Sequence, residues 1–152
     1  LQYCRRIAEK KIKALGLADD EIALCADTTV ALGRRILGKP SDREEANSFL
    51  SLLSGRRHKV ITCVAAKKQN QVKVKEVISV VKMKVLSFQE IETYLDSGDW
   101  EGKAGGYGIQ GPAASFIPWI SGSYTGIVGL PLTETMGLLS SLKYPVFGSK
   151  NG

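Results

Sequence analysis

The feature that most constrains this 152-residue chain is a pair of long runs rich in β-branched residues. The runs span residues 59–66 and 72–85, and a polar segment, residues 67–71, separates them. β-branched side chains favour strands, and a short polar segment between two such runs is typical of a hairpin. The sequence therefore predicts a long antiparallel strand pair.

Further strands are predicted earlier in the chain, between residues 22 and 40. Residues 22–26 form a short apolar run that is typical of a strand buried on both faces. Residues 29–32 and 36–37 are predicted to form a strand and its return, with a turn at Gly33-Arg34-Arg35. Asp27 interrupts this apolar pattern, and a plain core strand does not need a carboxylate there.

Four segments show the apolar periodicity of helices, and they lie at residues 1–15, 41–55, 87–98 and from 133 onward. Two of them begin with a capping box, in which a serine is followed three residues later by a glutamate: Ser41 with Glu44, and Ser87 with Glu90. The last helix is predicted to have Thr133 as its N-cap and to bury Met136, Leu139 and Leu142.

Glycine is concentrated between residues 102 and 111, where five of the ten residues are glycine. Lys103, Tyr107 and Gln110 lie among them. Ordering so much glycine costs conformational entropy. Such a loop is usually kept where the backbone must approach a ligand or a neighbouring chain segment. After it, residues 113–120 and 123–128 are predicted to form a hairpin.

The composition limits the possible partners and compartments. Lysine and arginine exceed the acidic residues by 21 to 15, and this charge of +6 favours anionic partners such as polyphosphates, nucleotides or nucleic acid. No apolar run approaches the length of a membrane span, so no membrane insertion is predicted. The three cysteines, an odd number without metal-like spacing, are typical of reduced thiols in an intracellular compartment, here taken as the cytoplasm.

Two apparent nucleotide-binding motifs fail on inspection. Residues 33–40 fit the phosphate-binding P-loop until the last position, where Pro40 has no hydroxyl to hold magnesium. Residues 106–111 match the dinucleotide fingerprint, but no predicted strand precedes them and Pro112 follows in place of a helix. Neither match therefore predicts a nucleotide site.

Asp27 has two interpretations. It is either a strand-end carboxylate that caps local N–H groups, or a functional acid that works with the lysines at positions 11, 39 and 103. A carboxylate can hold a metal or accept a proton from an attacking water, and lysines can stabilise a departing pyrophosphate. For any single lysine, a solvated surface position remains the more common case.

Several short motifs occur in a fixed order, and together they resemble the Maf family (septum formation inhibitor Maf) of nucleoside triphosphate pyrophosphatases. They are Ala26-Asp27-Thr28, Gly38-Lys39-Pro40, residues 53–58 with Thr62 after them, Lys103-Ala104-Gly105, residues 107–111, Gly122-Ser123-Tyr124 and residues 128–132. The match runs from the first predicted helix nearly to the end of the chain. A single tripeptide would be weak evidence, whereas the ordered set is specific.

The resemblance implies an α/β fold with a mixed central sheet, flanking helices and two lobes around a cleft, in one domain over residues 1–152. It implies a reaction in which a nucleoside triphosphate and water give the monophosphate and pyrophosphate. A divalent metal, Mg²⁺ or Mn²⁺, would assist this reaction. The resemblance also implies a homodimer.

The resemblance assigns roles to individual residues. Asp27 matches the catalytic acid, which accepts a proton from water and lies close to the metal. Lys11 and Lys39 match lysines that contact phosphates, and Lys103 is predicted to bind substrate as well. Thr28 and Gln110 match the positions that mark the subgroup acting on dTTP and UTP. A hydroxyl and an amide can both pair with the edge of a pyrimidine.

One departure from the family concerns the beginning of the chain. The family starts with a strand and a loop of the form Ser-x-Ser-Pro-Arg-Arg, which is not found before Leu1. We therefore expect an amino-terminally truncated member that binds nucleotide weakly and turns it over slowly. The alternative is a non-enzymatic regulator of cell division that binds nucleotide or, less expectedly, nucleic acid.

Overall fold

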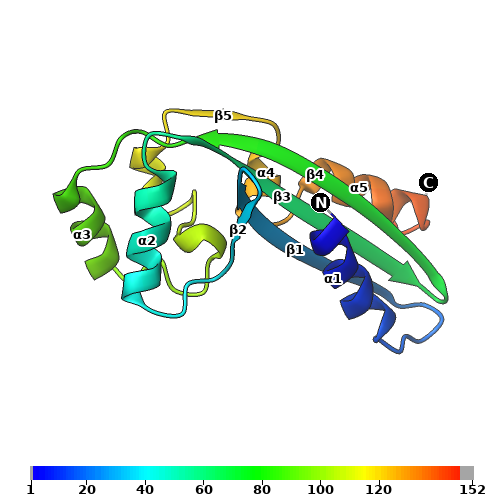
Figure 1. The fold of residues 1–152 in the computed structure, drawn as a ribbon. Helices are drawn as coiled ribbons and strands as arrows, with labels where there is room; N and C mark the ends of the chain where they lie inside the picture. Colours follow the sequence, from blue (N-terminus) through cyan, green and yellow to red (C-terminus); the bar gives the residue numbers. More distant parts are fainter. Residues whose placement is uncertain (1, 148–152) are drawn as a thin grey trace.

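A computed structural model describes residues 2–147, and in these residues a five-stranded sheet has the order β2-β1-β3-β4-β5 (Figure 1). The strands are β1 (Ile22–Leu32), β2 (Arg35–Leu37), β3 (Arg57–Lys68), β4 (Gln71–Lys82) and β5 (Trp119–Ser121). The predicted α/β class is confirmed. The predicted mixture of parallel and antiparallel strands is not found, because every pairing of the described strands is antiparallel. Tight turns at residues 33–34 and 69–70 make the β1–β2 and β3–β4 pairs antiparallel, whereas the β1–β3 and β4–β5 pairs are antiparallel although longer segments, each of which contains a helix, join their strands.

The predicted strand pair is confirmed as the hairpin of β3 and β4, which pair from Arg57 with Lys82 to Lys68 with Gln71. Strand β3 is buried continuously over residues 60–66, because helices cover both of its faces. Ile61 and Cys63 pack against the first helix, and Val64 packs against the last helix. This two-sided burial explains why β3 has a continuous apolar run rather than an alternating pattern.

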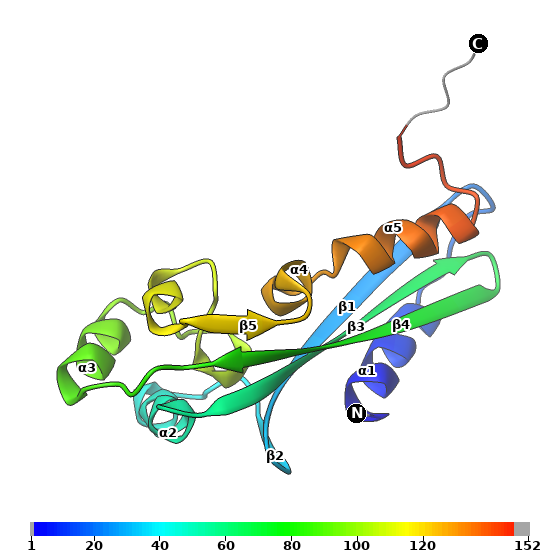
Figure 2. The same ribbon diagram turned by 90° about the horizontal axis from the view of Figure 1, so that it is seen from above.

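The helices form two groups at opposite ends of the sheet (Figures 1 and 2). At one end, α1 (Gln2–Lys13) covers one face, and α4 (Tyr124–Val128) and α5 (Leu132–Ser141) cover the other. At the other end lie α2 (Arg43–Leu53), α3 (Phe88–Asp96) and the 3₁₀ turns η1 (Ala104–Gly106) and η2 (Pro112–Phe116). Among the described helices, none combines the length and the apolar character needed to cross a membrane.

Lysines of the long hairpin cap the carboxyl ends of the helices that cover it. The Lys67 Nζ donates to the carbonyl of Leu15, 2.6 Å away, just beyond α1. The Lys68 Nζ donates to the carbonyl of Leu142 at the end of α5, 3.1 Å away. Cations stabilise the negative end of a helix dipole and satisfy its unpaired carbonyls. Part of the positive charge that suggested an anionic partner is therefore engaged within the fold.

One of the two predicted capping boxes is confirmed, and at the other helix the N-cap lies one residue later than predicted and forms no box. At α3, the Ser87 Oγ accepts from the Glu90 N–H and the Ser87 N–H donates to Glu90, as predicted. At α2 the N-cap is Asp42 rather than Ser41, because the Asp42 carboxylate accepts from the Glu45 N–H at 2.8 Å. Aspartate and serine cap helices about equally well, so adjacent candidates could not be separated by residue type.

The hairpin predicted for residues 113–120 and 123–128 is wrong. Residues 112–116 form η2, which begins at Pro112, and only residues 119–121 form a strand, β5. Residues 124–128 form α4, and the Ser123 Oγ caps it by accepting from the Gly126 N–H at 2.9 Å. Short apolar runs do not distinguish strands from short helices, so the periodicity was ambiguous here.

The start of the last helix also differs from the prediction. Helix α5 begins at Leu132, and Thr133 does not cap it. The Pro131 carbonyl instead accepts from both the backbone N–H and the hydroxyl of Thr135. Of the predicted inward residues Leu142 is buried, whereas Met136 and Leu139 are only partly buried.

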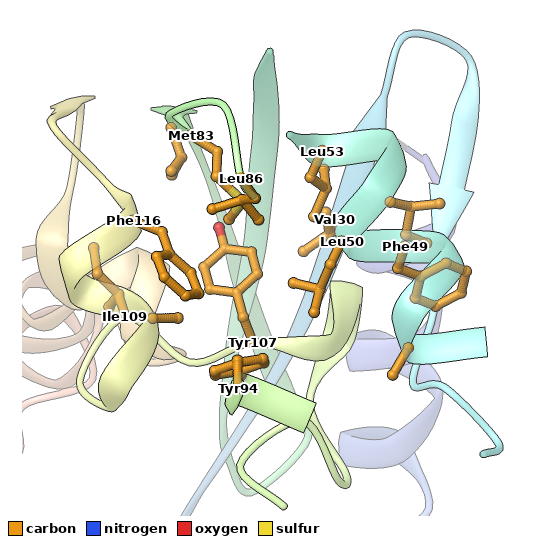
Figure 3. Close-up of a cluster of buried hydrophobic side chains, with 14 of the residues drawn as sticks. Val30, Phe49, Leu50, Leu53, Met83, Leu86, Tyr94, Tyr107, Ile109 and Phe116 are labelled. Atoms are coloured by element: carbon orange, nitrogen blue, oxygen red, sulfur yellow. The ribbon is translucent and has the colours of Figure 1, made fainter. Parts of the chain in front are cut away.

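The larger hydrophobic core lies between the α2–α3 group and the ends of β1, β3 and β4 (Figure 3). Tyr107 anchors the glycine-rich loop in this core, and its hydroxyl lies 2.5 Å from the Nε2 of buried His58. The Tyr94 hydroxyl donates to the carbonyl of Gly106 at 2.9 Å. These bonds fix a loop that would otherwise be costly to order.

Gly105 brings the same loop against the segment that follows β2. Its N–H donates to the carbonyl of Gly38 at 3.0 Å, and its φ of +71° lies in the left-handed region. A Cβ at this position would lie 3.0 Å from both methyl groups of Val30. The loop thus approaches a neighbouring chain segment, which is one of the two reasons expected for its glycine content.

Replacement of Gly105 by alanine is expected to lower the free energy of unfolding by about 1–3 kcal/mol, because the new methyl group collides with Val30 at a strained φ. Urea unfolding measures the change. Gly137→Ala is the matched control: a Cβ at this α5 position meets nothing within 4 Å, so we expect stabilisation by about 0.5–1 kcal/mol. Equal effects of the two substitutions would contradict this account of the loop.

His58, the only histidine of the chain, is expected to make stability fall in mild acid. Burial lowers its pKa from 6.5 to about 4, so below pH 6.5 the unfolded chain binds a proton that the folded chain does not. Between pH 7 and pH 5 the free energy of unfolding should drop by about 2 kcal/mol from this residue. Urea unfolding of His58→Gln should lack this part of the pH dependence. An identical dependence in both proteins would refute the prediction.

Candidate active site

A cavity of about 320 Å³ lies beside the part of β1 that β2 does not cover. Strand β2 pairs only with residues 30–32 of β1, so the outer edge of β1 at Asp27 and Thr28 has no strand neighbour among the described residues. The cavity walls come from α1, β1, the segment after β2, the glycine-rich loop and α4. These elements belong to both groups of helices, as expected for a cleft between two lobes.

Side chains of a strand alternate between its two faces, and the Asp27 side chain lies on the face that α1 covers, next to Lys11. The Lys11 Nζ lies 3.3 Å from the Asp27 Oδ1, and the two side chains are 54% and 21% exposed. An ion pair this accessible to solvent contributes little to stability, about 0–1 kcal/mol. The pair therefore places one carboxylate and one ammonium group at the cavity without being needed for the fold.

Two buried cysteines contact or pair with the backbone of Asp27. The Cys4 Sγ of α1 donates to the backbone carbonyl of Asp27 at 2.9 Å, and Cys63 is paired with Asp27 across β1 and β3. Burial raises the pKa of both the Cys4 and Cys63 thiols. Protonated thiols are poor nucleophiles and poor metal ligands, so Cys4 and Cys63 serve the packing around Asp27.

Thr28 points to the opposite face of the sheet, toward α4. Its Oγ1 lies 3.0 Å from the Oγ1 of Thr62, its cross-strand partner on β3. The Thr62 hydroxyl donates to the carbonyl of Gly126 in α4 at 2.6 Å. Thr62 was not among the predicted site residues. Thr62 belongs to one of the motifs that carry the family resemblance, but its position in a continuous apolar run gave no indication that its hydroxyl meets Thr28.

The remaining lysines reach the cavity from two different segments. Lys39 is exposed, and no acid of the described residues forms an ion pair with it. The Lys103 Nζ is tied to Asp99, donating to its carbonyl at 2.7 Å and to its carboxylate at 3.1 Å. Lys39 is therefore better placed than Lys103 to accept a new anionic partner.

The rest of the cavity wall is largely apolar, and the residues concerned are Val30, Val60, Ile109, Ile127 and Val128, with Tyr107 beside them. Such a wall suits the flat, weakly polar surface of a nucleobase. Gln110 is exposed and does not line the cavity, although its neighbour Ile109 does. Of the predicted site residues, the structure thus assembles Lys11, Asp27, Thr28, Lys39 and Lys103 and leaves Gln110 outside.

The lining residues suit a metal that arrives with a phosphorylated ligand. Asp27 is the one carboxylate on the cavity wall, and residues 2–147 contain no cluster of three potential metal-binding side chains. Mg²⁺ is commonly held by one or two carboxylates together with waters and substrate phosphates. This donor set fits a metal ion that is bound together with a nucleotide.

Comparison with known proteins agrees with this geometry. The family model described as Maf-like protein matches residues 1–142. A dTTP/UTP pyrophosphatase of Roseobacter denitrificans is 64% identical over 142 residues, which cover 93% of this chain and 76% of the relative. A dTTP/UTP pyrophosphatase of a Ruegeria species is 59% identical over 95% of this chain and 75% of its own.

A third relative has a broader name. It is a nucleoside triphosphate pyrophosphatase of Anaplasma phagocytophilum, 49% identical over 91% of this chain and 72% of its own length. The family match extends from the first helix to the end of α5 and includes every residue that lines the cavity. The chain belongs to the Maf family.

Proposed function

We propose that this protein hydrolyses dTTP and UTP to the corresponding monophosphate and pyrophosphate. The observation that carries the proposal is that one cavity has a charged part and an apolar part. Asp27, Lys11 and Lys39 supply the charge, while Thr28 and the apolar wall are suited to a base. The names of the Roseobacter and Ruegeria relatives support the same substrates.

In this reaction a water molecule attacks the α-phosphorus and the bond to the β-phosphate oxygen breaks. Asp27 accepts the proton of the attacking water. Lys39, which has no ion-pair partner among the described residues, stabilises the negative charge that builds up on the leaving pyrophosphate. Lys11 lies beside Asp27 and contacts the phosphates once the nucleotide is bound.

A divalent metal ion, Mg²⁺ or Mn²⁺, would neutralise charge on the phosphate oxygens when bound. Asp27 is the side chain of the cavity wall that would hold it. Lys103 also binds the substrate. Its Nζ leaves Asp99 and contacts a phosphate when the nucleotide is bound. The family resemblance assigns Gln110 a role in base choice, and its neighbour Ile109 lines the cavity although Gln110 itself does not.

We further propose a cytoplasmic location and a homodimeric assembly. The three free cysteines support a reducing compartment. The dimer rests on the family resemblance alone. A role in septum formation is proposed on the same resemblance.

Asp27→Asn tests the catalytic assignment. The amide keeps the shape of the side chain but cannot accept the proton or supply the charge, so kcat with UTP should fall by about 10²-fold or more. The protein, expressed from its whole reading frame, is incubated with dTTP or UTP and Mg²⁺, and pyrophosphate release is followed. Asp20→Asn, an exposed acid in the turn before β1 that does not line the cavity, is the matched control.

Two outcomes would overturn the proposal. One is a folded protein that releases no pyrophosphate from either nucleotide. The other is an Asp27→Asn variant as active as the control. Tight binding to DNA or RNA that weakens steeply with salt, in a protein without hydrolase activity, would support the regulatory alternative instead.

Lys39→Met tests how the leaving group is stabilised. Loss of a cation that acts on the developing charge should lower kcat/KM for UTP by about 10²-fold, with a clear fall in kcat. Lys59→Met removes an exposed lysine that does not line the cavity, and it should leave both constants near their original values. If the two variants behave alike, Lys39 contributes only general surface charge.

A further inference from the structure

We propose that Thr62 fixes the direction of the Thr28 hydroxyl, so that the cavity accepts an N–H group from the base and thereby prefers uracil and thymine to cytosine. The inference rests on the proposed pyrophosphatase function. It concerns a positioning residue, Thr62, which lies behind the cavity wall and does not line it.

The direction follows from the number of protons available. A hydroxyl group carries one proton and can accept at its lone pairs, whereas a carbonyl can only accept. The Thr62 Oγ1 lies 2.6 Å from the Gly126 carbonyl oxygen, so its proton is directed there. In the 3.0 Å contact between the two threonines, the Thr28 hydroxyl must therefore be the donor.

The opposite arrangement is unfavourable because of where these groups lie. Thr62 is fully buried, and Gly126 is buried in the short helix α4. The carbonyls of the last helical turn have no partners within the helix, so the Gly126 carbonyl depends on an outside donor. If Thr62 turned its proton toward Thr28, that carbonyl would be left buried without a hydrogen bond.

The consequence for a ligand is that Thr28 offers only lone pairs to the cavity. Phosphate oxygens are acceptors and are disfavoured next to it, while Lys11 and Asp27 lie on the other face of β1. Ile127 and Val128 lie beside Thr28 in the cavity wall and suit a base. Thr28 therefore meets the edge of the base, and a ring N–H is the group that it can bind.

Pyrimidine bases differ at this atom. Uracil and thymine carry a proton on N3, whereas N3 of cytosine has a lone pair and no proton. An acceptor fixed at Thr28 therefore binds the first two and repels the third. A ribose hydroxyl could also donate to Thr28, but UTP and CTP have the same ribose, so a comparison of these nucleotides isolates the base.

The test compares kcat/KM for UTP with kcat/KM for CTP, measured as pyrophosphate release. The unmodified protein should favour UTP. Thr62→Val removes the acceptor that holds the Thr28 proton, and the freed hydroxyl can then donate to N3 of cytosine. The UTP-to-CTP ratio should fall by about tenfold, the size expected for one hydrogen bond.

Two further variants separate this role from loss of stability. Thr62→Ser keeps the hydroxyl and should keep the ratio. Thr135→Val removes another buried threonine hydroxyl that also donates to a backbone carbonyl, that of Pro131, and should leave the ratio unchanged. A fall in the ratio with Thr62→Val alone supports the inference, and an unchanged ratio in that variant overturns it.

The unmodified protein also tests the inference without any substitution, even if Thr62→Val does not fold. Hydrolysis of CTP as efficiently as UTP would overturn the inference and leave the pyrophosphatase function standing. Failure to release pyrophosphate from dTTP, UTP and CTP alike would overturn the proposed function itself.

Discussion

The candidate site depends on the pairing of β1 with its two neighbours. Strand β3 pairs with β1 over residues 22–31, whereas β2 covers only residues 30–32 of the other edge. Among residues 2–147, the backbone at Asp27 thus has a strand neighbour on one side only. Because successive side chains alternate between faces, two adjacent residues lie on opposite faces of β1. Asp27 meets Lys11 on the α1 side, and Thr28 meets Thr62 on the α4 side.

This arrangement separates two kinds of recognition within one cavity. Charged groups line the part where phosphates are proposed to bind, and apolar groups together with Thr28 line the part assigned to the base. The glycine-rich loop closes the remaining side, because Gly105 packs directly on Val30 and Tyr107 is anchored on His58. Rigidity at the site thus comes from the core of the α2–α3 group as well as from the sheet.

Strong local patterns in the sequence predicted the central hairpin and the first three helices, whereas the grouping of Asp27, Lys11 and Lys39 around one cavity was implied by the family resemblance. Weak or short patterns did not predict the segment 113–128, where proline and serine caps decided the outcome. The antiparallel arrangement of the whole sheet and the position of Gln110 outside the cavity depend on tertiary packing, which no local pattern encodes. Thr62 was not predicted as a site residue for the same reason. Its hydroxyl contacts Thr28 and Gly126, which lie 34 and 64 positions away in the sequence.

The burial of His58 has a consequence for binding in mildly acidic solution. Histidine is the side chain that ordinarily gains a positive charge between pH 7 and pH 5, and this chain has one, with a pKa of about 4. A phosphate group takes up its own proton near pH 6, at about its second pKa. As a solution is acidified, a nucleotide therefore loses negative charge while the protein gains none from histidine in return. Attraction between lysines and triphosphate should weaken on acidification, and the cause lies in the ligand.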